Sequence, residues 1–197
     1  VFFEVLLAAS YGLLLHGDHT GRRARLKAAV HYVVFNLSGS ALFLLAVSLL
    51  YGLTGTLNLA DLAEKVPQLG PENARLAQAA ALMLLVVFAV KAALLPLYFW
   101  LPDTYASATA PVAALFAIMT KVGVYAIARV TTLVFGATGG WAAEIATPML
   151  PTLALATLVL AAIGTLAAKH LRALVAYLVV GSAGTLLLAI GLGTPVA

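Results

Sequence analysis

Long apolar segments, separated by short polar connections, are the feature that most constrains how this chain folds. They cover residues 1–15, 28–53, 76–108 with a break near 95–100, 110–135, 148–168 and 171–192. A helix needs about 20 residues to cross the hydrocarbon core of a bilayer. Helices and closed barrels are the structures that leave no backbone group unpaired there, and the alternation expected of barrel strands is absent. We therefore predict an all-α integral membrane protein with about six transmembrane helices.

The composition excludes several other classes of protein. Of the 197 residues, 63% are hydrophobic and 9% are charged, whereas a soluble domain carries about 25% charged residues. Without cysteine, these residues form no disulfide, cysteine-ligated zinc site or iron–sulfur cluster. The sequence shows no nucleotide-binding fingerprint and no catalytic triad. We expect no catalytic residue, no metal and no cofactor.

The charges of the connections predict the orientation in the membrane. One connection carries Arg22, Arg23, Arg25 and Lys27 without interleaved aromatic residues, and Lys169–Arg172 is a second basic turn. The positive-inside rule explains both better than nucleic-acid binding does, and it places both on the cytoplasmic side of the plasma membrane. The connection 54–75 then lies outside. Within it, "LNLADLAEKV" has helical spacing of its apolar residues and predicts a short interfacial helix.

Three charged residues inside apolar segments indicate function. A charge at the bilayer centre costs at least about 3 kcal/mol and usually marks a pathway or a paired group. Lys121 lies roughly 16 Å from the start of its helix, Lys91 roughly 22 Å from the start of its own, and Glu4 about 17 Å deep if its helix ends near Leu15. A buried carboxylate changes the proton affinity of a nearby amine. We interpret Glu4, Lys91 and Lys121 as stations of a proton or cation path.

A predicted helix break lies close to Lys91. Pro96 and Pro102 stand in "LLPLYFWLPD", and Pro96 has no N–H to offer the carbonyl of Ala92. Backbone groups freed inside a bilayer are tolerated where they are buried in protein or line water. We therefore expect helical hydrogen bonding to be interrupted between about Leu94 and Trp100, beside a hydrated pocket.

Three further polar residues are weaker candidates. Asp103 follows the break, where a cap of the next helix is the simpler interpretation and a proton carrier the alternative. His31 opens the second span and His170 lies in the basic turn, and a histidine relays protons near neutral pH.

Four stretches carry a resemblance to a known family. They are "FFEVLLAASYGLLLHG", "GSALFLLAVSLLYGLTGTLNLADLA", "VKAALLPLYFWLPDTYASATAPVAALFAIMTKVGVYAIARV" and "KHLRALVAYLVV". Across the whole chain the sequence resembles the proton-conducting antiporter family. Its members are the Mrp-type multisubunit cation/proton antiporters and the antiporter-like subunits of respiratory complex I and membrane hydrogenases. Complex I relatives more often have a histidine where Tyr105 stands, so the D-type subunit of the Mrp antiporters is the most similar form.

The resemblance implies a longer bundle of two inverted repeats, of which this chain would be a fragment. It implies that Glu4 is the acidic partner, Lys91 the central lysine on a broken helix and Lys121 the relay lysine. It also implies other membrane subunits as partners and protons and a monovalent cation, by expectation Na⁺, as substrates. "AYLVVGSAGTLLL" departs from complex I relatives, which often have serines after the tyrosine, and this weakens a polar relay on that helix.

Three functions remain open from the sequence. The first is a subunit of a Na⁺ (cation)/H⁺ antiporter, a secondary transporter rather than an enzyme. The second is a proton-pumping subunit of an NADH:quinone oxidoreductase or membrane hydrogenase. The third is a non-conducting membrane scaffold, which predicts that Lys91 and Lys121 can be replaced without loss.

Overall fold

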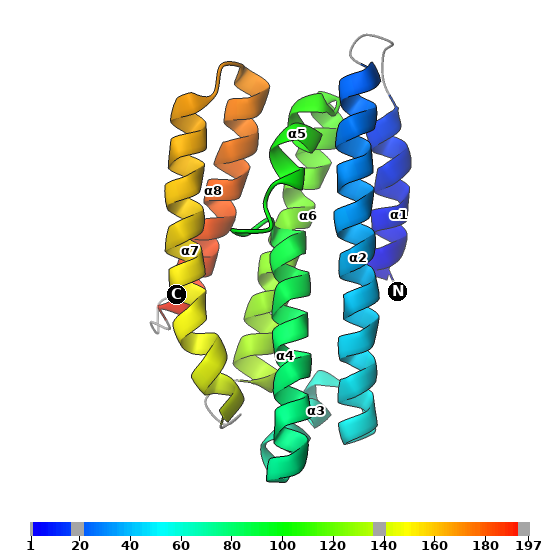
Figure 1. Ribbon diagram of the computed structural model, residues 1–197, viewed down its shortest axis with the longest axis vertical. Helices are drawn as coiled ribbons and strands as arrows, with labels where there is room; N and C mark the ends of the chain where they lie inside the picture. Colours follow the sequence, from blue (N-terminus) through cyan, green and yellow to red (C-terminus); the bar gives the residue numbers. More distant parts are fainter. Residues whose placement is uncertain (1, 17–21, 136–140, 193–197) are drawn as a thin grey trace.

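The computed structural model describes the backbone of residues 2–16, 22–135 and 141–192, and the side chains of 5–16, 22–135 and 149–192. Within these residues, every regular element is a helix (Figure 1). In chain order they are α1 (Phe2–Leu15), α2 (Arg22–Thr54), α3 (Leu59–Lys65), the 3₁₀ turn η1 (Val66–Gln68), α4 (Pro71–Ala92), α5 (Trp100–Ser107), α6 (Ala110–Arg129), the π-helical turn η2 (Val130–Val134), α7 (Trp141–Ala167) and α8 (Leu171–Gly191).

Among the described residues, five helical stretches are long and apolar enough to cross a membrane, and α1 contributes a shorter apolar helix. The five are Arg22–Thr54, Pro71–Ala92, Ala110–Val134, Met149–Ala167 and Leu171–Gly191. The predicted all-α membrane class is thus confirmed. Three helices, α2, α4 and α7, begin before the expected apolar segments. The Arg22–Lys27 residues that precede the second segment are good helix formers, and Pro71 stands at the first position of α4, where a proline loses no hydrogen bond.

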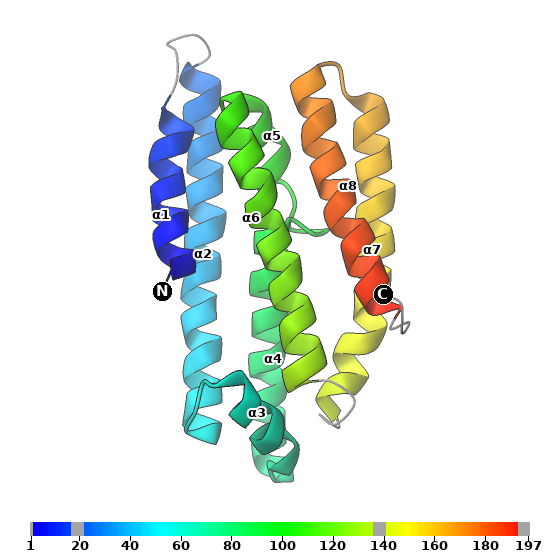
Figure 2. The same cartoon turned by 180° about the vertical axis from the view of Figure 1, so that it is seen from behind.

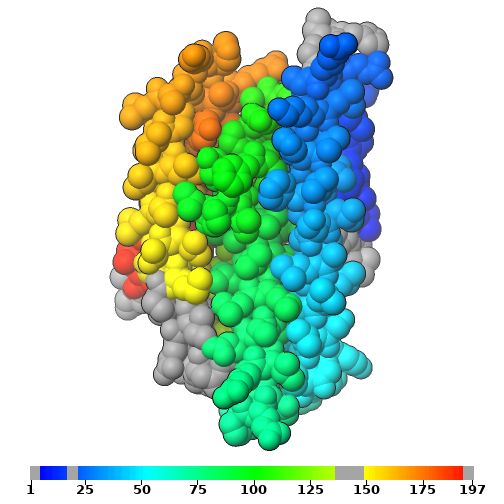
Figure 3. Space-filling model, in the orientation of Figure 1, coloured from blue at the N-terminus to red at the C-terminus, as the bar shows by residue number. Residues whose placement is uncertain are grey.

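The helices form three groups that lie side by side. In Figure 1, α1 and α2 stand on the right, α4 to α6 in the centre, and α7 with α8 on the left. Figure 2 shows the opposite face, where α6 covers the centre in place of α4. Figure 3 shows the side chains of α4 between those of α2 and α7 on the front face. Helix α4 contacts α2, α6 and α7. It therefore connects the three groups of helices.

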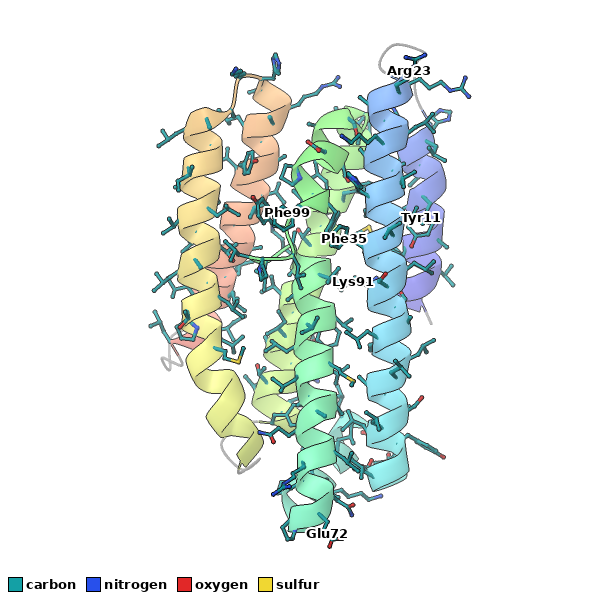
Figure 4. The ribbon with its side chains drawn as sticks, in the orientation of Figure 1. Tyr11, Arg23, Phe35, Glu72, Lys91 and Phe99 are labelled. Atoms are coloured by element: carbon teal, nitrogen blue, oxygen red, sulfur yellow. The ribbon has the colours of Figure 1, made fainter. Side chains whose placement is uncertain are left out.

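The two ends of the bundle differ in charge. Arg23 lies at the end where α2 begins and Glu72 at the other (Figure 4), and the turn between α7 and α8 lies at the Arg23 end (Figure 1). We call these the basic end and the α3 end. The helix expected within "LNLADLAEKV" is α3. The Asn58 side chain accepts a 2.9 Å hydrogen bond from the Ala60 N–H at its start, and Leu62 and Val66 are buried.

The long third segment is interrupted from Ala93 to Phe99. Ala93 takes the left-handed conformation, with φ 53°. The Ala93 N–H donates to the Val90 carbonyl at 3.1 Å and the Leu94 N–H to the Ala89 carbonyl at 2.9 Å, the two bonds of a Schellman motif. The helix therefore ends one residue before the expected start of the break, because a helix that reached Pro96 would collide with the Ala92 carbonyl.

The proline and the carboxylate after the break lie differently from what we expected. Pro102 lies inside the first turn of α5 and not in the interruption itself, because the first helical N–H groups have no intrahelical acceptor in any case. Asp103 is exposed in the same turn. Phe99 holds the cap position of α5, and it makes no side-chain hydrogen bond there. The interpretation of Asp103 as the residue that caps α5 is wrong, because Phe99 stands at that position; the role of Asp103 as a proton carrier stays a prediction.

Candidate functional site

Lys91 occupies the last turn of α4, directly before the helix break. Its side chain is only 5% exposed, and Figure 4 shows it at mid-height between Arg23 and Glu72. Its Nζ donates to the Ser40 hydroxyl of α2 at 3.5 Å. A Cβ on Gly39 would lie 3.9 Å from the Lys91 Cε, so the lysine stem packs against the α2 backbone.

Ser40 ends a polar stripe on α2 that faces Lys91. Tyr32, Asn36 and Ser40 follow one another at four-residue spacing, and all three are buried. The Asn36 amide donates to the Tyr32 carbonyl at 2.8 Å, and the Ser40 hydroxyl donates to the Asn36 carbonyl at 3.0 Å. Because the Ser40 proton points to Asn36, the lone pairs of its oxygen can accept from the Lys91 ammonium.

Two spaces adjoin Lys91 on opposite sides. Toward the basic end lies a small cavity of about 10 Å³, which we call the chamber. It is lined by Leu7, Tyr32, Asn36, Lys91, Trp100, Tyr105, Phe116 and Met119. Toward the α3 end, an apolar groove of about 330 Å³ runs from Lys91 past Phe43 to Leu59 and Arg129. Lys91 thus lines both spaces.

The broken backbone finds its hydrogen-bond partners within the bundle. The Trp100 indole N–H donates to the Val90 carbonyl at 3.0 Å, and the Leu95 N–H donates to the Thr157 hydroxyl of α7 at 3.1 Å. These two bonds hold the interruption between α4 and α7 and place the Trp100 ring over the chamber. The break accordingly positions polar and aromatic groups around Lys91.

Lys121 lies in the middle of α6 and reaches a different neighbour. Its half-buried side chain donates to the Ser182 hydroxyl of α8 and, at 3.3 Å, to the Val179 carbonyl. Two residues further on, Gly123 lies against α4, where an added Cβ would be 2.7 Å from the Ala92 nitrogen. Lys91 therefore faces α2 and Lys121 faces α8, on the two sides of the α4–α6 contact.

The remaining candidates lie apart from these lysines or outside the described side chains. Glu4 belongs to the backbone of α1, but its side chain is outside the described part. His31 is exposed on α2, and His170 is exposed at the start of α8. Neither histidine lines the chamber or the groove.

The sequence interpretation missed the partners of both lysines. Tyr32, Asn36 and Ser40 recur every four residues in an otherwise apolar run, and that periodicity is a usable signal of a polar helix face. No such signal marked Ser182, because one serine in a helix does not indicate which neighbour it meets. Ser182 nevertheless gives this helix one polar contact, its hydrogen bond from Lys121, and the expected weakness of a polar relay along the helix stays a prediction.

Fold and site together define a multi-pass membrane protein with ammonium groups between its helices. The chain belongs to the family described as NADH:quinone oxidoreductase/Mrp antiporter, transmembrane, whose sequence model matches residues 1–197. The resemblance noted in the sequence is confirmed.

Two curated relatives are antiporter subunits by name, both of the D type. The chain is 50% identical to a probable K(+)/H(+) antiporter subunit of Rhizobium meliloti, over 98% of this chain and 35% of the relative. It is 40% identical to a Na(+)/H(+) antiporter subunit of Bacillus subtilis, over 99% of this chain and 38% of the relative. The chain thus spans little more than a third of the length of these relatives.

Solved structures show the same fold within larger assemblies. A chain of the archaeal membrane-bound sulfane sulfur reductase matches with a TM-score of 0.85 at 31% identity, over 96% of this chain and 37% of that one. The Mrp complex from Dietzia matches with a TM-score of 0.83 at 29% identity, over 97% and 34%. Respiratory complex I from Thermus thermophilus matches with a TM-score of 0.79 at 30% identity, over 98% and 40%.

Proposed function

We propose that this chain is part of a membrane subunit of a multisubunit cation/proton antiporter and that Glu4, Lys91 and Lys121 move protons through it. The observation that carries the proposal is Lys91, which is buried at a helix break with a polar helix face and a cavity beside its ammonium group. Charged residues at such depth are rare in membrane proteins and typically belong to ion pathways.

The surroundings of Lys91 fit the gain and loss of a proton. The Lys91 side chain is buried, and its ammonium group donates a hydrogen bond to the Ser40 hydroxyl. In the proposed step, the ammonium group releases a proton to a water molecule, and the neutral amine later takes a proton from the opposite side. Lys91 lines both the chamber and the groove, and this supports access to it from two sides.

Glu4 is proposed as the carboxylate that modulates Lys91. Leu7, one helical turn after Glu4 on α1, lines the chamber next to Lys91, and residues three apart lie on the same helix face. The negative charge of a carboxylate stabilises a nearby ammonium group, and we propose this role for Glu4 toward Lys91. Lys121 is proposed as the next station, in contact with α8.

The relatives support our proposals for the cation, the partners and the membrane. Names that include K(+)/H(+) and Na(+)/H(+) support a monovalent cation, and our expectation remains Na⁺. The match to an Mrp complex supports neighbouring membrane subunits, and bacterial relatives support the plasma membrane. The matches to two respiratory complexes favour a second candidate, a proton-pumping subunit of a redox enzyme.

The test is the substitution of Lys91 by arginine in the assembled complex. Arginine keeps the positive charge but does not release its proton, so Lys91→Arg should lose coupled transport as fully as Lys91→Ala. The matched control is Lys65→Arg, because Lys65 is exposed in α3 and its ammonium group donates to the Thr54 carbonyl, far from the chamber. Proton flux in membrane vesicles, with subunit amounts matched, is the measurement. Normal flux with Lys91→Arg would show that Lys91 supplies charge without relaying protons.

A further inference from the structure

Tyr32 is the central side chain of an aromatic cluster between the chamber and the basic end. Its ring stacks on Phe116, with centroids 5.5 Å apart and an angle of 19°. It also contacts Trp100 at 5.3 Å and, edge to face, Tyr11 at 5.6 Å. Tyr32 precedes Ser40 by two turns of α2, or about 12 Å toward the basic end. We call these four rings the aromatic plug; Tyr32, Trp100 and Phe116 line the chamber, and Tyr11 packs against Tyr32.

The plug makes the surroundings of Lys91 asymmetric. The chamber on the plug side offers about 10 Å³, which is at the lower limit for a single water molecule. The groove on the α3 side offers about 330 Å³. In this conformation, the larger of the two spaces beside Lys91 therefore lies on the α3 side.

A hydrogen bond between α1 and α2 holds the plug in place. The Tyr32 and Ser10 hydroxyl oxygens lie 2.7 Å apart, and the Ser10 hydroxyl donates to the Leu7 carbonyl. The Tyr32 O–H is therefore the donor between the two side chains. Ser10 and Tyr32 are only 1% and 2% exposed, so loss of this bond leaves a buried hydroxyl without its partner, at a cost in free energy. The position of the Tyr32 ring is consequently tied to that of α1.

We propose that Tyr32 is a gate that closes Lys91 toward the basic end, and that the Ser10 hydroxyl keeps the gate closed. A shift of α1 along α2 breaks this bond, releases the ring and joins the chamber to the basic end. Because α1 also carries Glu4, the helix that holds the proposed carboxylate is the one that controls the gate. This inference rests on the proposed function for the role of Lys91. The gate itself is tested by a measurement of chemical access that does not depend on transport.

The experiment measures access to the chamber from the basic end. Met119, which lines the chamber, is replaced by cysteine in the full-length protein within its complex, with any other cysteines removed. A small thiol reagent is added to vesicles whose basic end faces outward. Tyr32→Phe keeps the ring and loses the bond to Ser10, so it should raise the labelling rate about fivefold, the factor that one net hydrogen bond contributes. Ser10→Ala should give the same increase, and the double variant should add nothing.

Matched controls separate gating from general loosening. Tyr51→Phe makes the same chemical change at an exposed position of α2, and Ser38→Ala does so for an exposed serine; neither should change the rate. Tyr32→Ala, if it assembles, should give the fastest labelling. Parent-like rates in Tyr32→Phe and Ser10→Ala would overturn the gate, as would an equal increase from the α3 end. The labelling experiment measures access to the chamber and the Lys91→Arg test measures proton flux. Failure of the gate can therefore be distinguished from failure of the proposed function.

Discussion

At the scale of single residues, the two lysines of the bundle differ in what they touch. Lys91 is enclosed by α2 and the aromatic groups around the break. Lys121 is half-buried and bonds directly to α8 through Ser182. A hydrogen bond to a charged group contributes more than one between neutral groups. Removal of Ser182 should therefore affect Lys121 more than removal of a neighbouring hydroxyl that bonds only its own helix.

Ser182→Ala should slow coupled transport on the order of tenfold, because a hydrogen bond to a charged group is worth about 1.5–3 kcal/mol. Ser182→Thr keeps a hydroxyl and should restore most of the rate. The control is Thr185→Ala, since the Thr185 hydroxyl is exposed and donates to the Gly181 carbonyl of its own helix. Proton flux in vesicles measures all three variants. Equal losses in Ser182→Ala and Thr185→Ala would contradict a specific role for the Lys121–Ser182 contact.

At the scale of helices, the close approach of α6 to α4 sets the position of both lysines. Gly123 follows Lys121 by two residues and lies against the backbone at Lys91 and Ala92, where an added Cβ would meet atoms at 2.7 to 3.1 Å. These are backbone atoms, which cannot turn away as a side chain would. A residue larger than glycine at this position must separate the two helices.

Gly123→Ala should lower the thermal stability of the purified complex and abolish transport, since overpacking of this kind typically costs about 1–3 kcal/mol. Gly52→Ala is the matched control, because Gly52 is also helical and nothing lies within 4 Å of an added Cβ there. That control should be neutral or slightly stabilising, as alanine favours a helix over glycine. A thermal melt in detergent measures the stability. An unchanged melting temperature for Gly123→Ala would show that α6 can move away from α4 at no cost.

Prediction from the sequence succeeds for features that single helices encode. Apolar length identifies the membrane-spanning helices. The missing N–H of Pro96 and its clash with Ala92 require a break, and the structure has one from Ala93 to Phe99. Contacts between helices are beyond such reasoning. The stacking of Tyr32 on Phe116 and the reach of Lys121 to Ser182 depend on the register of neighbouring helices, which apolar periodicity leaves undetermined.

At the scale of the whole molecule, the surface of the bundle is apolar over the middle of its helices. Leu44, Val159, Ile163 and Leu178 are among its exposed hydrophobic side chains. A soluble protein rarely exposes so much apolar surface, whereas lipid tails or neighbouring helices cover it in a membrane. The exposed charged residues gather toward the two ends instead. Their distribution predicts the orientation of the bundle in the membrane.

The orientation is the last prediction. Arg22, Arg23 and the turn Lys169–Arg172 lie at the basic end, and Glu72 lies at the α3 end, so the positive-inside rule places the basic end in the cytoplasm. Cysteines introduced singly at Lys169 and Glu72 of the full-length protein, both exposed positions, are treated with a reagent that does not cross the membrane.

Glu72→Cys should react in intact cells, and Lys169→Cys should react only after the membrane is opened or inverted. Arg23→Cys should behave like Lys169→Cys, because the two positions share one end of the bundle across an even number of spans. The parent protein without reactive cysteines provides the background. Reaction of Glu72→Cys and Lys169→Cys from the same side would contradict the arrangement of the helices as membrane spans. Reaction of all three from the opposite sides to those expected would keep the spans and reverse the orientation, and with it the side on which the Tyr32 gate opens.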